Sequence, residues 1–110
     1  MLNNRAVDRF AALAEPNRRR MIELVAAGPR RAGAIAEAFD LSAPAVSQHL
    51  KALRQAGLVQ VEVRGQRRIY SLDPDGLAEV DGWIARVRGF WGERLDALEA
   101  ALKEDKGESE

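Results

Sequence analysis

Hydrophobic positions recur at helical spacing through the first 40 residues of the chain. Residues 4–14, 16–27 and 31–39 each place apolar residues three or four positions apart, which predicts three short amphipathic helices. Pro16 suits the first position of the second helix, and Gly28 suits its end. The apolar side of the first helix is formed by Val7, Phe10, Ala11 and Leu13.

The clearest helical pattern follows at residues 42–57. Ser42 can cap a helix by accepting a hydrogen bond from a first-turn N–H, and Gly57 is suited to end it. One apolar stripe runs along this helix through Val46, Leu50 and Leu53. The helix and the preceding one are joined by about three residues, which predicts a helix-turn-helix.

The side of this helix that faces away from the stripe is small and polar. It carries Pro44, Gln48 and Lys51, flanked by Ala45 and Ser47, and it contains no acid. A solvated helix more often mixes acids and bases on its outer side. An acid-free outer side suits a helix that lies in the major groove of DNA.

After Gly57 the hydrophobic period changes from helical to two. Residues 59–64 alternate valine with polar residues, Gly65 and Gln66 form a two-residue turn, and residues 67–72 return as a second strand. The sequence therefore predicts a mainly α fold with a β-hairpin wing, that is, a winged helix-turn-helix. Three arginines gather at or beside the hairpin tip, namely Arg64, Arg67 and Arg68.

A long last helix is expected from Asp73, a good cap, to about Lys103. Its apolar stripe would extend roughly 38 Å at about 1.5 Å per residue, more than a small domain covers by itself. Part of the helix can pack on its own domain, but we expect its far end, with the first helix, to contact a second copy. The expected interface residues are Val7, Phe10, Val80, Ile84, Val87, Trp91, Leu95 and Leu98. Trp83, Phe90 and Trp91 of such a dimer can line an apolar pocket, although packing in the dimer core is favoured.

Charge is divided unevenly along a chain whose net charge is zero. Residues 1–72 carry 12 Lys plus Arg against 6 Asp plus Glu, whereas residues 73–110 carry 5 against 11. A basic half favours contact with a polyanion, and charges sorted by chance on solvated faces are the alternative. The chain has no cysteine, no apolar run of membrane-spanning length and no apolar leader at its start, so a cytoplasmic protein is expected. We expect one domain at residues 1–103 and a polar tail at residues 104–110.

Three stretches together resemble the ArsR/SmtB family of bacterial repressors. They read AEPNRRRMIEL at residues 14–24, LSAPAVSQHLKALRQAGLV at residues 41–59, and RRIYSLDP at residues 67–74. With the flanking helices, the resemblance covers nearly the whole chain. It implies a dimeric winged-helix repressor that dimerises through its first and last helices.

The DNA contacts are expected from the helix at residues 42–57, which would be the recognition helix, from the wing and from the start of the third helix. Gln48 and Ser47 can hydrogen-bond base edges, and Ala45 can touch a thymine methyl. Lys51 and Ser42 are better placed for phosphates, and the wing arginines can enter the minor groove. His49 is expected to make a local hydrogen bond or a phosphate contact. The full predicted set is Arg31, Ser42, Pro44, Ala45, Ser47, Gln48, His49, Lys51, Arg64, Gln66, Arg67 and Arg68.

Many members of the resembled family sense metals, and this chain lacks the residues for that. The family's thiolate site would fall on residues 31–39, which contain no cysteine. The family's other site uses histidines and carboxylates of the last helix, where this chain has carboxylates but no histidine. Carboxylates alone suit zinc, copper or nickel poorly, so no metal and no cofactor are expected. The carboxylates are Glu79, Asp81, Glu93, Asp96 and Glu99.

No catalytic machinery is evident, because the sequence has no cysteine nucleophile, no Gly-rich phosphate loop and a single histidine. We expect a homodimeric regulator that binds a palindromic operator in double-stranded DNA, and the family resemblance implies that it is a repressor rather than an activator. The alternative is a dimeric winged-helix module that binds a protein partner through the same basic face. The sequence identifies neither an operator nor an inducer.

Overall fold

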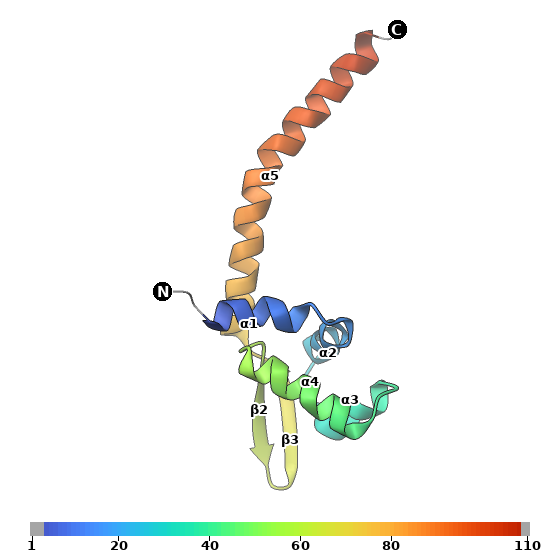
Figure 1. The fold of residues 1–110 in the computed structure, drawn as a ribbon, viewed down its shortest axis with the longest axis vertical. Coiled ribbons are helices and arrows are strands. Elements are labelled where there is room, and N and C mark those ends of the chain that lie inside the picture. The colour runs from blue at the N-terminus through green and yellow to red at the C-terminus, as the bar shows by residue number, and fades with distance from the viewer. Residues whose placement is uncertain (1–3, 109–110) are drawn as a thin grey trace. The chain divides into compact units, whose positions relative to one another are not determined.

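The computed structural model describes the backbone of residues 4–108 and the side chains of residues 9–105 (Figure 1). The described residues up to Val80 form one compact unit, and those from Asp81 form another. The elements are α1 (Asn4–Leu13), α2 (Pro16–Ala26), β1 (Arg30–Arg31), α3 (Ala32–Ala38), α4 (Ala43–Gln55), β2 (Val59–Arg64), β3 (Arg67–Leu72) and α5 (Pro74–Glu108). The winged helix-turn-helix predicted from the sequence is confirmed.

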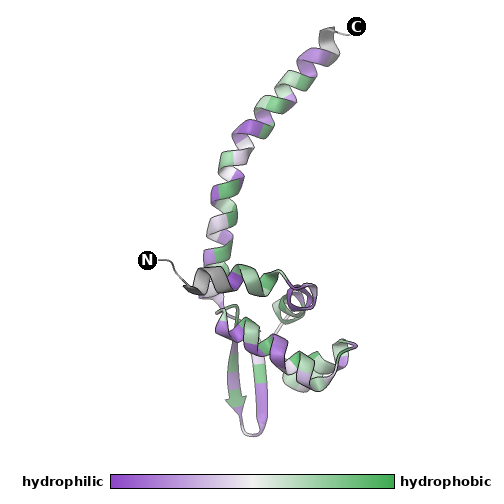
Figure 2. Ribbon diagram, viewed as in Figure 1, coloured by the Kyte–Doolittle hydropathy of each residue, from purple (hydrophilic) through white to green (hydrophobic). Residues whose placement is uncertain are grey.

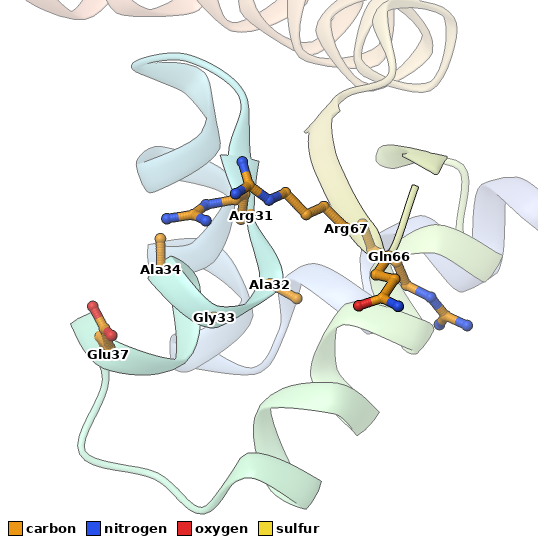
Figure 3. Close-up of a pocket in the computed structure, with 8 residues that line it drawn as sticks. Arg31, Ala32, Gly33, Ala34, Glu37, Gln66 and Arg67 are labelled. Atoms are coloured by element: carbon orange, nitrogen blue, oxygen red, sulfur yellow. The ribbon is translucent and has the colours of Figure 1, made fainter. Parts of the chain in front are cut away.

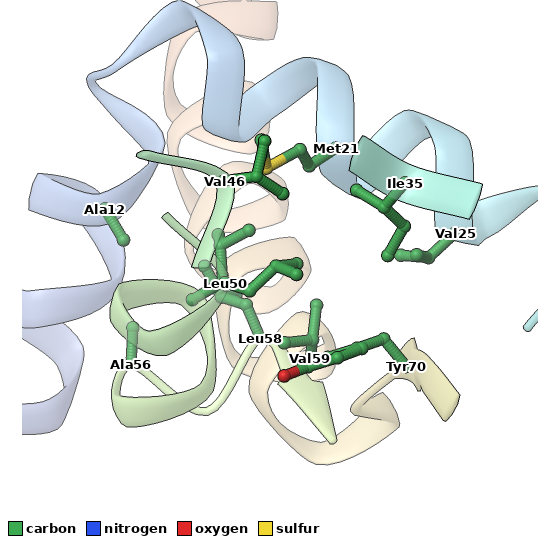
Figure 4. Close-up of a cluster of buried hydrophobic side chains, with 11 residues drawn as sticks. Ala12, Met21, Val25, Ile35, Val46, Leu50, Ala56, Leu58, Val59 and Tyr70 are labelled. Atoms are coloured by element: carbon green, nitrogen blue, oxygen red, sulfur yellow. The ribbon is translucent and has the colours of Figure 1, made fainter. Parts of the chain in front are cut away.

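The core of the first unit lies between the helices and the inner face of the sheet (Figure 4). Each of the predicted apolar stripes supplies part of it. Met21, Ile35 and Leu53 are fully buried, and Tyr70 packs against them from the wing. Burying each such side chain stabilises the folded state by about 1.5–3 kcal/mol, so the core fixes the helices against the sheet.

The recognition helix α4 begins and ends as its sequence predicts. The Ser42 hydroxyl oxygen accepts a hydrogen bond from the Ala45 N–H at 3.2 Å. At the other end Gly57 has a φ of +73°, and the Leu58 N–H donates to the Leu53 carbonyl oxygen at 3.0 Å. This is the pattern of a Schellman C-cap, in which the left-handed residue is best filled by glycine.

The wing is a two-stranded antiparallel hairpin to which a third, very short strand is added. β2 and β3 pair from Val59 opposite Leu72 to Arg64 opposite Arg67, with the expected two-residue turn between them. β1 pairs with the outer edge of β3, so the strand order is β1-β3-β2. The sequence placed Arg31 at the start of the third helix and did not indicate β1, because two residues are too few for a period-two pattern.

Helix α1 packs on the core through Ala12 and the partly buried Leu13, beside a buried arginine. Phe10 is 39% exposed, whereas Ala12 and the charged Arg9 are buried. The Arg9 Nε donates to the Ala56 carbonyl oxygen at 3.0 Å, and its guanidinium pairs with Glu79 at the start of α5. A cation suits the carbonyl-rich end of α4, so this contact orients α1 in place of purely apolar packing.

Replacing Arg9 with methionine should lower the free energy of unfolding by about 2 kcal/mol, because the Ala56 carbonyl loses its charged donor. Urea denaturation followed by circular dichroism measures this change. Arg86→Met is the control, since Arg86 is an exposed residue of α5 and its replacement should change stability by less than about 0.5 kcal/mol. Equal stability of both variants and the wild type would contradict this role for Arg9.

Helix α5 starts as expected and ends later than expected. The Asp73 carboxylate accepts a hydrogen bond from the Asp75 N–H at 3.1 Å, and Pro74 is the first helical residue. The helix continues to Glu108, beyond the predicted end near Lys103. Hydrophobic and hydrophilic residues alternate from turn to turn along it in Figure 2. Among the described residues, no helix has the length and apolar character needed to cross a membrane.

Candidate nucleic-acid interface

The outward side of α4 is a surface without negative charge. The Val46, Leu50 and Leu53 stripe is buried, which turns the opposite side of the helix to solvent. Between Asp40 and Glu62 the chain contains no acid at all. The residues exposed on this side are Ser42, Ala43, Pro44, Ser47, Gln48 and Lys51, with Ala45 half-buried beside them.

The wing meets the N-terminal half of α4 at a pocket. This pocket has a volume of about 250 Å³, and both Ser47 and Arg68 line it together with Tyr70. The structure therefore brings Arg68 close to Ser47 at the recognition helix. Apolar residues of α3 and α4, from glycine and alanine to Leu50, complete the lining.

His49 lies against α2 rather than among the outward residues of α4. Its Nδ1 accepts a hydrogen bond from the Arg18 Nε at 3.2 Å and lies 3.8 Å from the Glu15 carboxylate. Its side chain is only 18% exposed. The same Glu15 caps α2 by accepting from the Arg18 N–H at 2.9 Å. His49 thus makes the local hydrogen bond expected from the sequence and ties the recognition helix to the start of α2.

The three wing arginines differ in their partners. Arg64 donates to both carboxylate oxygens of Glu62, at 3.1 and 3.3 Å. Within residues 9–105, the side chains of Arg67 and Arg68 have no hydrogen bond or ion pair. Gln66 is exposed at the turn between the strands. The charge that remains available at the wing tip therefore belongs to Arg67 and Arg68.

Arg31 joins the wing tip across a groove of about 480 Å³ (Figure 3). The groove is lined by residues of α3 on one side and by Gln66, Arg67 and Arg68 on the other. Arg31 contributes to β1 and is exposed. The predicted residues of the third helix and of the wing are thus brought together at one place.

Like Arg18, the next two arginines of the run at residues 18–20 have partners within the chain. Arg19 donates to the carbonyl oxygens of Leu13 and Ala14, and Arg20 lies 5.5 Å from the Phe39 ring centre. Such contacts engage these side chains within the chain itself. None of these arginines lines the groove between α3 and the wing.

Two features of this surface were not predicted from the sequence, namely the ion pair of Glu62 with Arg64 and the pairing of β1 with β3. Glu62 and Arg64 are two residues apart on a strand and so share a face, which was a usable signal for their ion pair. The pairing of β1 with β3, which positions Arg31 beside the wing, had no such signal. In the part of the chain that the structure describes, no cluster of three His, Asp or Glu could hold a metal ion.

The residues expected at a dimer interface are largely exposed within the single chain. Trp91, Leu95 and Leu98 are 49%, 58% and 55% exposed, and Ile84 and Phe10 are also exposed. Val80 and Val87 are half-buried, and the side chain of Val7 lies outside the described ones. Beside the stripe, the Arg94 guanidinium lies 4.4 Å from the Phe90 ring centre. Trp91, Leu95 and Leu98 thus form apolar surface that the single chain leaves exposed.

Comparisons with known proteins agree with this architecture. Residues 15–61 match the family model described as bacterial regulatory protein, arsR family. The chain is 41% identical to the HTH-type transcriptional regulator Rv2034 of Mycobacterium tuberculosis, over 98% of both chains. It is 37% identical to the transcriptional repressor SdpR of Bacillus subtilis, over 68% of this chain and 83% of that one.

Among solved structures, a homodimeric winged helix-turn-helix DNA-binding domain of Mycobacterium bovis, described as a possible ArsR-family regulator, matches with a TM-score of 0.65. The identity is 28%, and the match covers 78% of this chain and 80% of that one. The matched family model contains the helix-turn-helix and the start of the wing, and the first relative spans all the described elements. The chain therefore belongs to the arsR family of bacterial regulatory proteins.

Proposed function

We propose that this protein is a homodimeric transcriptional repressor that binds a two-fold symmetric operator in double-stranded DNA. The observation that carries the proposal is the outward side of α4, which is polar, exposed and free of acids over a buried stripe. Such a helix can enter the major groove without bringing negative charge near the phosphates. The names of SdpR, a repressor, and Rv2034, a regulator, support the same function.

In this proposal the residues of α4 divide into two groups. Gln48 and Ser47 hydrogen-bond base edges, and Ala45 contacts a thymine methyl. Lys51 and Ser42 contact phosphates, which fix the position of the helix without reading sequence. The Ser42 oxygen accepts from the Ala45 N–H, so its hydroxyl proton is left to donate to a phosphate.

Dimerisation through α5 and α1 follows from the apolar side chains that the single chain leaves exposed. A stripe that includes Trp91, Leu95 and Leu98 at about half exposure is costly to leave in water. A second copy covers it symmetrically, as in other two-fold dimers. Two recognition helices then reach half-sites about one helical turn apart, or roughly 34–36 Å.

The test begins with selection of bound fragments from a pool of random duplexes by the purified full-length protein. The enriched duplex and a scrambled version are then compared by fluorescence anisotropy over a salt series. We expect selective binding to a palindromic sequence with affinity that falls steeply as salt rises, because phosphate contacts release counterions. Failure to enrich any sequence, with equally weak binding to both duplexes, would overturn the proposal.

Replacing Gln48 with alanine should cost about 1–3 kcal/mol of binding to the selected duplex and relax its preference at one base pair per half-site. The amide of this exposed side chain can hydrogen-bond a base edge, and alanine cannot. Anisotropy with duplexes substituted at single base pairs measures both effects. Gln60→Ala, which removes an exposed glutamine from β2, is the control and should bind like the wild type. Unchanged affinity and unchanged base preference for Gln48→Ala would contradict the assignment.

A further inference from the structure

Strand register places three arginines on the outer face of the sheet. Residues directly opposite in antiparallel strands share a face, and so do residues two apart along one strand. Arg31 is opposite Ile69, and Arg64 is opposite Arg67. Because positions 67 and 69 share a face, Arg31, Arg64 and Arg67 all lie on the face away from the core. Tyr70 marks the opposite, inner face by its burial.

Within residues 9–105, Arg64 is the one of these three cations that has an ion-pair partner. Glu62 shares the outer face and holds Arg64 through two hydrogen bonds. Arg31 and Arg67 have no ion pair within residues 9–105, and Glu37, which lines the neighbouring groove from α3, pairs with neither. Directly opposed like charges, here Arg64 and Arg67, destabilise a strand pair. The outer face therefore carries a positive charge that a bound anion would stabilise.

Arg31 and Arg67 are placed to share one anion. They occupy diagonal positions across β1 and β3, a separation of roughly 7–8 Å that long side chains can span. Both line the same groove, and in Figure 3 the Arg67 side chain extends from β3 toward Arg31. Each guanidinium presents parallel N–H donors that match two oxygens of a phosphate.

Arg30 and Arg68, which are adjacent in sequence to Arg31 and Arg67, lie on the inner face of the sheet. Arg30 is opposite Tyr70, and Arg68 is two residues from Tyr70, so both lie on the inner side of the sheet. The Arg30 Nε is buried without a hydrogen-bond partner among the described residues, and Arg68 lines the pocket beside Ser47. Arg68 therefore lines both the groove that Arg31 and Arg67 share and the pocket at the recognition helix, but it projects from the inner face of the sheet.

We propose that Arg31 and Arg67 of each protomer together bind a single phosphate of the DNA backbone, and that Arg64 takes no part. The proposal rests on the proposed function, since it assigns one contact of that complex. DNA is the source of phosphate that fits, because the groove lies between the first helix of the helix-turn-helix and the wing. A phosphate held here anchors the wing and sets register, while the sequence is read elsewhere.

The test is a double-mutant cycle on the selected duplex. Arg31→Ala, Arg67→Ala, the double variant and Arg64→Ala are compared with the wild type by anisotropy over a salt series. Circular dichroism and thermal unfolding check that every variant is folded. Each single loss should weaken binding on the order of tenfold, and the double variant should lose far less than the product of the single losses. The slope of log affinity against log salt should become shallower by about 0.9 per protomer in Arg31→Ala, in Arg67→Ala and in the double variant. Each of these variants loses the same single phosphate contact.

A second measurement locates the phosphate. Duplexes in which one linkage at a time is a neutral methylphosphonate should bind the wild type weakly at one position per half-site. Arg31→Ala and Arg67→Ala should both be insensitive to that same substitution, whereas Arg64→Ala should respond like the wild type.

Four results would overturn the inference. Multiplicative losses with a doubled change in slope would mean two separate phosphates. An effect of Arg64→Ala as large as that of Arg67→Ala would mean a diffuse basic patch. Wild-type protein that binds no duplex would overturn the proposed function and this site with it, whereas selective wild-type binding with a normal Arg31→Ala variant would overturn this site alone.

Discussion

Replacing Leu95 and Leu98 together with glutamate is expected to convert the dimer into a monomer and to lower operator affinity at least about 100-fold. Both side chains are more than half exposed in the single chain and belong to the apolar stripe of α5. Two buried carboxylates from each copy would have to lose their hydration on association, which costs several kcal/mol per charge. A monomer then binds one half-site without the effective concentration that the linked second site provides.

Sedimentation velocity measures the oligomeric state, and anisotropy with the selected duplex measures binding. The matched control is Ala85→Glu with Ala100→Glu, which adds the same charge to the same helix at exposed positions well away from the stripe. The control is expected to remain dimeric and to bind DNA with the wild-type affinity to within a few-fold. A dimeric Leu95→Glu, Leu98→Glu variant would show that the interface lies elsewhere.

Replacing Gly76 with alanine should lower the free energy of unfolding by about 4 kcal/mol or more, beyond the usual effect of a point substitution. A Cβ at position 76 would overlap the carbonyl oxygen of Gly57 and lie 2.7 Å from its carbonyl carbon. Both atoms belong to the backbone of the α4 C-cap, so they cannot move aside without breaking that cap. Gly57 itself has the positive φ that the cap requires.

Urea denaturation of the purified variant measures this loss, and a low yield of folded protein would be part of the same effect. Gly89→Ala is the control, because no atom lies within 4 Å of a Cβ at that position of the same helix. It should stabilise the protein by about 0.5–1 kcal/mol through the higher helix propensity of alanine. A Gly76→Ala variant as stable as the wild type would mean that α5 does not start in contact with α4.

Most of the fold could be predicted because its signals are local. Ser42 and Asp73 cap helices through their own neighbours, and the hairpin is defined by alternating residues around a two-residue turn. The stripe of α4 was also readable, since its three apolar positions are one or two turns apart. These features follow from short-range geometry, whatever the rest of the chain does.

The parts that could not be predicted depend on contacts between distant positions. Arg9 is buried because the end of α4 and the start of α5 supply its partners, and nothing in residues 4–14 indicates this. Hydrophobicity marked the side that carries Phe10, which was expected at a dimer interface and is 39% exposed in the single chain. The candidate DNA-binding residues were chosen one by one, and only the register of β1 against β3 shows which arginines stand together.

The short β1 strand has a consequence for how the protein and DNA would fit each other. An isolated two-stranded hairpin is only marginally ordered, and pairing of Arg30 and Arg31 with β3 attaches the wing to the first helix of the helix-turn-helix. A wing that is already fixed does not pay an ordering entropy on association. In the proposed complex the double helix is then the partner that must bend or narrow, at a cost set by its base steps. Operator positions that no side chain touches would therefore contribute to selectivity.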